Sequence, residues 1–300
     1  MYEEHFHLAN APFNQGPDPD GLYITEAIRD ALAVLAYGVN RHKGFILLTG
    51  DVGTGKTTIL QVFMRWLQSR GASTALIFNP HLDPDDFLEQ MGRDFGVEKG
   101  TESKGQWMVR FNNWLLDRYR DKAPVVLLVD EAQQLSEQVL EELRLLTNLE
   151  TPTHKLLQIV LCGQPEIEEI LARPSLRQVR QRINLVCRTS TFSEIQTAEY
   201  VTQRLRLCGA ADEIAVFENE ALREVHRITK GVPRLINAVC EQALIEAYCD
   251  GKPSVEAEMV VKVADQGDLA LEESGLRDGD LELNGVQSIA LHGCVVERIP

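Results

Sequence analysis

The sequence lacks any run of about 18 apolar residues, the length that a membrane-spanning helix requires. Its first residues carry no basic region followed by an apolar stretch. We therefore expect no signal peptide and no transmembrane span of its own. Basic residues are also scarce, since 30 Lys and Arg stand against 45 Asp and Glu, which gives a formal net charge of -15. This balance argues against a broad nucleic-acid-binding surface, because phosphate backbones are held mainly by Lys and Arg.

Cysteine is sparse too, with six residues among 300 and no C-x-x-C pair. A chain of this length with 44% hydrophobic residues can bury a sizeable core without disulfide or metal staples. We interpret the cysteines as reduced thiols of a cytosolic protein, most of them small core residues. They are Cys162, Cys187, Cys208, Cys240, Cys249 and Cys294.

Four short apolar runs bounded by turn residues predict strands that are buried on both faces. They cover residues 44–49, 74–78, 125–129 and 156–162. Helical patterns lie between them, at residues 57–69, 84–95 (with Asp83 as N-cap), 106–119 and 136–146. Strands that alternate with helices predict an α/β fold with a parallel sheet between layers of helices.

After about residue 189 the pattern becomes helical only. Ser193 and Gln196 form a capping-box pattern that opens a helix to about Leu207. Further helices are predicted at residues 217–229, 233–248 and 254–265. We therefore predict an α/β nucleotide-binding domain at 1–190, a small helical lid domain at 191–266, and an acidic tail at 267–300 that serves as a linker or interaction segment.

The strongest motif is GDVGTGKT at residues 50–57, which matches G-x-x-x-x-G-K-[ST] between a predicted strand and a predicted helix. In such a loop the backbone N–H groups face phosphates, Lys56 neutralises the β and γ oxygens, and the Thr57 hydroxyl binds Mg²⁺. The simpler alternative is a glycine-rich turn, which the strand and helix on either side argue against. The predicted ATP-binding residues are Gly50, Asp51, Val52, Gly53, Thr54, Gly55, Lys56, Thr57 and Thr58.

Two carboxylates, Asp130 and Glu131, follow the run at residues 125–129. Ligands collect at the carboxyl ends of parallel strands, so we predict that Asp130 holds Mg²⁺ together with Thr57, directly or through water. Glu131 is the predicted group that polarises the attacking water. The alternative is an acidic pair that merely caps a helix. Gln164 follows the next run, where a polar side chain reaches a γ-phosphate, although such a residue alone is more often part of a turn.

Arginines gather at residues 173–188, a stretch with no acidic residue. They are either a solvated helix face or a group of which at least one member reaches the γ-phosphate of a neighbouring subunit. The five are Arg173, Arg177, Arg180, Arg182 and Arg188. A further arginine, Arg234, opens a helix after Gly231-Val232-Pro233, and it either swings over the nucleotide or is an ordinary surface residue.

Taken together, these residues resemble the AAA+ ATPases, and more narrowly the ExeA/GspA-like secretion ATPases of bacteria. The resemblance extends over roughly residues 2–265. It rests on HFHLANAPF, PDPDGLYIT, GFILLTGDVGTGKTT, VVLLVDEAQQLS, LEELRLLTNLET, LQIVLCGQPEI, LRQVRQRI and TKGVPRLINAVCEQAL.

The resemblance implies a five-stranded parallel sheet, a helical lid and a Mg²⁺-dependent ATPase whose nucleotide lies between subunits of a homo-oligomeric ring or filament. It implies that Gln164 is sensor 1, Arg234 sensor 2 and Arg182 the arginine finger, with Arg180 and Arg177 as alternatives. The segment around Pro12 and Phe13 either walls the adenine site or docks as plain hydrophobic residues.

The implied partner is a protein client of a secretion, pilus or polysaccharide-export machine of the cell envelope. We expect a cytoplasmic location, peripheral at the inner membrane through that partner, because this sequence lacks the transmembrane helix and the peptidoglycan-binding domain of the full-length secretion form. Related AAA+ domains select DNA targets in transposition, an alternative that the acidic balance disfavours. A signalling or defence ATPase with only a switch function is the third class.

Overall fold

The computed structural model describes residues 1–78, 82–211 and 215–266, and the predicted acidic tail lies outside them. The described residues fall into two compact units. One unit, the α/β unit, contains Glu26–Val52 and Lys56–Thr189. The other, the helical unit, contains Met1–Thr25, the short segment Gly53–Gly55 and the described residues between Ser190 and Gln266.

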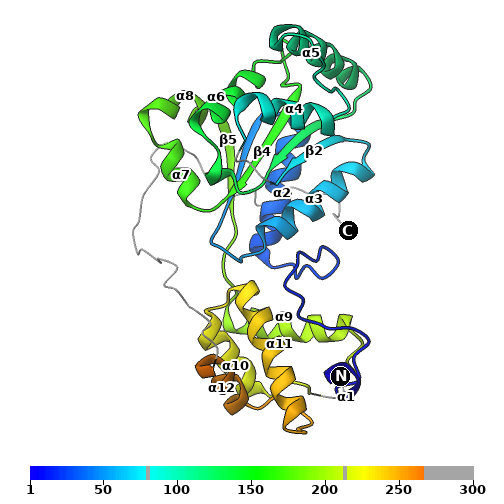
Figure 1. The fold of residues 1–300 in the computed structure, drawn as a ribbon, viewed down its shortest axis with the longest axis vertical. Helices are drawn as coiled ribbons and strands as arrows, with labels where there is room; N and C mark the ends of the chain where they lie inside the picture. The colour runs from blue at the N-terminus through cyan, green and yellow to red at the C-terminus, as the bar shows by residue number, and fades with distance from the viewer. Residues whose placement is uncertain (79–81, 212–214, 267–300) are drawn as a thin grey trace. The chain divides into compact units, whose positions relative to one another are not determined.

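The α/β unit is built on a five-stranded sheet with the order β2-β3-β4-β1-β5, and every neighbouring pair is parallel (Figure 1). The strands are β1 (Phe45–Thr49), β2 (Ser73–Ile77), β3 (Val125–Val129), β4 (Leu157–Gly163) and β5 (Ile183–Arg188). β1, β3 and β4 are buried along their whole length, which explains their continuous apolar runs. The predicted α/β fold with a parallel sheet is confirmed.

Helices cover both faces of this sheet. α2 and α3 contact one face, while α4 and α6 pack together over the other. The helices of the unit are α2 (Glu26–Asn40), α3 (Lys56–Ser69), α4 (Pro84–Asp94), α5 (Lys104–Arg120), α6 (Glu137–Leu146), α7 (Glu166–Leu171) and α8 (Arg177–Arg180), with 3₁₀ turns at η1 (Ala132–Gln134) and η2 (Pro174–Leu176).

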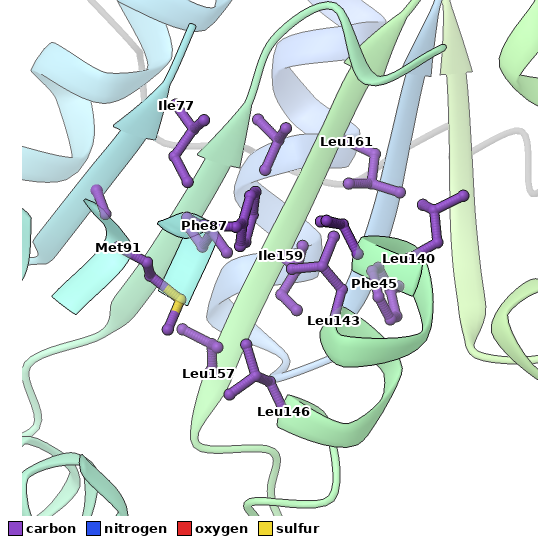
Figure 2. Close-up of a cluster of buried hydrophobic side chains, with 14 of the residues drawn as sticks. Phe45, Ile77, Phe87, Met91, Leu140, Leu143, Leu146, Leu157, Ile159 and Leu161 are labelled. Carbon is purple, nitrogen blue, oxygen red and sulfur yellow. The ribbon is translucent and has the colours of Figure 1, made fainter. Parts of the chain in front are cut away.

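Alternation along the strands divides the core between these two layers. Figure 2 shows one layer, in which side chains of α4 and α6 meet side chains from the strands. The labelled residues are Phe45, Ile77, Phe87, Met91, Leu140, Leu143, Leu146, Leu157, Ile159 and Leu161. All are at most 1% exposed, so the sheet and the loops at its carboxyl edge rest on a tightly packed support.

The helical unit contains α1 (Tyr2–His5), α9 (Glu194–Leu207), α10 (Asn219–Thr229), α11 (Pro233–Cys249) and α12 (Ala257–Gln266). α10 contacts α9, α11 and α12. The N-terminal segment belongs to this unit, because Phe13 is 1% exposed and packs edge-to-face against Phe217. The sequence-based division had assigned residues 1–25 to the α/β domain. The structure places them instead with the helices that bury their apolar side chains.

The residue patterns did not locate the fifth strand, β5, or the helix α2, nor the short helices α1, α7 and α8. β5 is a half-exposed edge strand that includes Arg188, so it has no continuous apolar run. Two predicted helices also begin later than expected, at Asn219 and Ala257. An isolated bridge between Phe217 and Val255 occupies the preceding backbone, where the Val255 N–H donates to Val216.

The predicted helix caps are confirmed where the structure tests them. The Asp83 side chain accepts from the N–H groups of Asp85 and Asp86. Ser193 and Gln196 form the predicted reciprocal capping box. Ser103 caps α5 in the same way with Gln106, which moves the start of that helix to Lys104.

The cysteines of the described residues are all free thiols. Three of them are buried, as predicted for core residues: Cys162, Cys187 and Cys240. Cys208 is half-buried and Cys249 is exposed, while Cys294 lies outside the described residues. None of the helices in the described ranges is both long and apolar enough to cross a membrane.

Candidate functional site

The loop between β1 and α3 has the conformation that its glycines predict. Gly53 and Gly55 have φ angles of +78° and +87°, which only glycine adopts at little cost. The Lys56 ammonium is buried and donates to the carbonyl oxygens of Gly50 and Asp51, at 2.7 and 2.8 Å. α3 begins at Lys56, so its first N–H groups, which have no partner within the helix, face this loop. Loop, lysine and helix end together form a group of hydrogen-bond donors that could hold a phosphate, called the phosphate cradle below.

Thr57 and Asp130 lie side by side at the carboxyl edge of the sheet. The Thr57 hydroxyl donates to an oxygen of Asp130 over 2.7 Å, and Asp130 is only 3% exposed. Adjacent oxygen ligands in an octahedral Mg²⁺ shell are about 3.0 Å apart, given Mg–O distances of about 2.1 Å. The two oxygens therefore fit one Mg²⁺ ion. The described residues contain no cluster of three metal-binding side chains, and the predicted site needs none, because Mg²⁺ takes phosphate oxygens and waters as further ligands.

Glu131 follows in a strained conformation. Its φ and ψ are 51° and 39°, in the left-handed region that a non-glycine residue seldom occupies. Its carboxylate oxygen Oε2 accepts from the side chain of Gln133 at 2.6 Å and, more weakly, from Gln164 at 3.5 Å. The structure thus brings Glu131 and Gln164 together, although 33 positions separate them in the chain.

The strand order explains that proximity. β4 lies between β1 and β3, so the residue that follows β4 emerges between the phosphate cradle and the two carboxylates. Cys162, near the end of β4, lies in the same place. Burial and then the negative charge of Asp130 raise the pKa of its thiol, so Cys162 stays protonated and serves as a small core residue.

Glu168 on α7 contacts both Thr49, the residue before the phosphate loop, and Arg188 on β5. It accepts from the Thr49 hydroxyl at 2.9 Å and receives two hydrogen bonds from the Arg188 guanidinium, at 3.2 and 2.8 Å. This pair raises the pKa of Arg188. Arg188 is therefore committed to an acid of its own chain.

The other arginines of residues 173–188 divide by their contacts. Arg173 pairs with Glu137 at 3.0 Å, and Arg182 donates to the Asn148 side chain at 3.1 Å. Arg177 and Arg180 are exposed, and neither side chain forms an ion pair with an acid among the described residues. The stretch is a short helix, α8, followed by β5, rather than one continuous helix face.

Arg234 and Gln133 differ in how they relate to the site predicted from the sequence. Arg234 lies at the first turn of α11 in the helical unit and is exposed, and its sensor role stays a prediction. Gln133 was not among the predicted residues, although it contacts both Glu131 and the backbone of Gln164. A polar residue two positions after the acidic pair was the available signal.

Comparison with known proteins agrees with this geometry. Residues 39–171 match a family model described as an AAA domain. The chain is 39% identical over 301 residues to General secretion pathway protein A of Aeromonas hydrophila, covering 99% of the chain and 52% of that relative. The chain therefore spans about half the length of that protein.

Solved structures share the fold at low identity. The Aeropyrum pernix ORC2 protein, in its ADPNP–ADP complexes, aligns with a TM-score of 0.64 at 17% identity, over 86% of this chain and 71% of that one. The Thermotoga maritima RuvB Holliday junction branch migration motor aligns with a TM-score of 0.56 at 16% identity, over 84% and 72%. The AAA-domain match and the similarity to General secretion pathway protein A, together with the parallel sheet and the loop after β1, indicate an AAA+ P-loop fold that resembles that protein.

Proposed function

We propose that this chain binds ATP with Mg²⁺ and hydrolyses it to ADP and phosphate. The observation that carries the proposal is the 2.7 Å contact between Thr57 and Asp130, next to the buried Lys56 ammonium. Two oxygen ligands beside one cation suit a Mg²⁺–triphosphate, and this supports the proposal. Bound Mg²⁺ would neutralise charge on the phosphates.

The residues of the chain supply the remaining chemistry. Lys56 and the loop N–H groups bind and orient the phosphates, and Glu131 accepts a proton from the attacking water. Gln164 lies beside Glu131, where its amide is suited to contact the γ-phosphate. The left-handed backbone at Glu131 supports this assignment, because strained conformations concentrate at functional sites.

We further propose that the protein oligomerises around nucleotide. Among the described residues, neither exposed Arg180 nor half-buried Arg182 forms a direct ion pair with an acid of its own chain. Such a cation, supplied in trans, stabilises charge that develops on the transferred phosphoryl group. Arg182 is our first candidate, and Arg180 and Arg177 follow.

The cellular role we propose is to drive or switch the assembly of a bacterial cell-envelope secretion, pilus or polysaccharide-export machine. The 39% identity to General secretion pathway protein A supports it. We expect a cytoplasmic protein that reaches the inner membrane through its client.

The test of the enzymatic proposal is ATP hydrolysis measured with and without Mg²⁺ in four proteins. Lys56→Ala should abolish nucleotide binding. Glu131→Gln should keep binding and slow turnover by about two or more orders of magnitude, because a water-orienting group is lost. Glu98→Gln changes an exposed carboxylate away from the sheet edge and should match the native protein. Normal turnover in Glu131→Gln would show that Glu131 does not activate the attacking water.

A further inference from the structure

Gln133 occupies a position that neither the predicted site residues nor the proposed function uses. It lies in the 3₁₀ turn after the acidic pair, and its side chain bridges two strands' ends. One end of its amide receives the backbone N–H of Gln164 at 3.0 Å, and the other end contacts Glu131 at 2.6 Å.

The orientation of this amide follows from its partners. A backbone N–H only donates, so the Gln133 atom that faces Gln164 must be the carbonyl oxygen. The NH₂ group must then face Glu131 and donate to its Oε2. The Gln164 N–H at the end of β4 therefore fixes the orientation of the Gln133 amide, and the amide NH₂ in turn fixes the position of Oε2 of Glu131.

The backbone at Gly163 leaves room for the Gln133 amide. A Cβ at Gly163 would lie 2.7 Å from the Gln133 carbonyl oxygen, so any other residue there would displace the amide. Glu131 itself is held in the left-handed region. No described residue donates to the second carboxylate oxygen, Oε1, which leaves that oxygen available to a water.

We propose that Gln133 is a positioning residue for hydrolysis, which fixes Oε2 of Glu131 so that Oε1 faces the attacking water. The inference rests on the proposed ATPase function. It predicts that Gln133 acts through Glu131 alone, on the rate of the chemical step, and leaves nucleotide binding unchanged.

The test compares variants of the full chain by kcat and KM for Mg–ATP hydrolysis, by ATP affinity from calorimetry, and by thermal stability. Gln133→Met keeps the side-chain length and removes both hydrogen bonds. Gln133→Glu keeps the acceptor for Gln164 and replaces the donor to Glu131 with a like charge. The matched control is Gln134→Met, because Gln134 is the exposed next residue of the same turn.

We expect kcat to fall about 10- to 100-fold in both Gln133 variants, the range found for groups that orient a catalytic ligand. KM, affinity and the Gln134 control should stay within about twofold of the native values. In a Glu131→Gln background, Gln133→Met should cause no further loss, since two residues that act as one unit are not additive.

Three results would overturn the inference. They are a native-like kcat in Gln133→Met and Gln133→Glu, an equal additional loss in the Glu131→Gln background, or a loss of affinity that accounts for the whole effect. Failure of the proposed function has a different signature, namely no turnover in the native protein or normal turnover in Glu131→Gln.

Discussion

Arg204 on α9 and Asp18 in the N-terminal segment form an ion pair at 2.5 Å, with the arginine side chain only 6% exposed. The same guanidinium donates through Nε to the Pro12 carbonyl at 2.7 Å. One buried cation thus holds two points of the segment that precedes the sheet. Because Arg204 is almost completely desolvated, the pair is costly to break from either side.

The first prediction concerns stability. Arg204→Met should lower the free energy of unfolding by about 1–3 kcal/mol, less than for a fully buried pair because Asp18 stays partly in water. Urea denaturation measures this change, and limited proteolysis should cut residues 1–25 faster. Arg223→Met is the control, since its ion pairs are exposed and should contribute less than about 1 kcal/mol. Equal stability of the two variants would contradict the anchoring role.

The second prediction concerns the shared site. Arg182→Ala should lower turnover with little effect on nucleotide affinity, because the cation acts on the neighbouring subunit's nucleotide. ATP or a non-hydrolysable analogue should promote oligomers in sedimentation experiments. Mixing Arg182→Ala with Lys56→Ala subunits should restore part of the activity. If dilute monomer hydrolyses ATP as fast as concentrated protein, a shared site is wrong.

The third prediction concerns DNA. The net charge is -15, and the pairing of Arg173 and Arg188 with acids leaves three of the five arginines at 173–188 to hold phosphates. ATPase turnover should therefore be indifferent to duplex DNA at about 150 mM salt, where screening approaches physiological strength. Clear stimulation, with loss of that stimulation in Arg177→Glu, would favour the transposition-type role instead.

The fourth prediction concerns thiol reactivity. Burial raises the pKa of Cys187 to about 12 and holds the pKa values of Cys162 and Cys240 well above their ordinary range, so these thiols stay protonated at pH 8. Since the thiolate is the reactive form, a thiol reagent should label exposed Cys249 first and the three buried thiols only after unfolding. Mass spectrometry of a Cys294→Ser variant measures this order. Early labelling of Cys162 would show that the sheet edge opens.

Features that depend on neighbouring residues could be predicted from the sequence alone. The phosphate loop at residues 50–57 is contiguous, and its positive-φ glycines, its lysine and the following helix start all lie within a few residues of one another. Asp83 and Ser193 cap their helices by accepting from backbone N–H groups two or three positions further along the chain. The buried strands were predictable because both of their faces are apolar.

Contacts between residues far apart in the chain depend on the three-dimensional arrangement of the strands and helices. The placement of β4 between β1 and β3 brings Gln164 to Glu131 and gives Gln133 its bridging role, and no periodicity in the chain encodes that order. The edge strand β5 was not predicted, because a strand at the edge of a sheet has a neighbouring strand on one side only and needs no continuous apolar run. The N-terminal segment joins the helical unit through Arg204 and Asp18, 186 positions apart. Pairing over such separations depends on the packing of the whole core, which a local pattern does not contain.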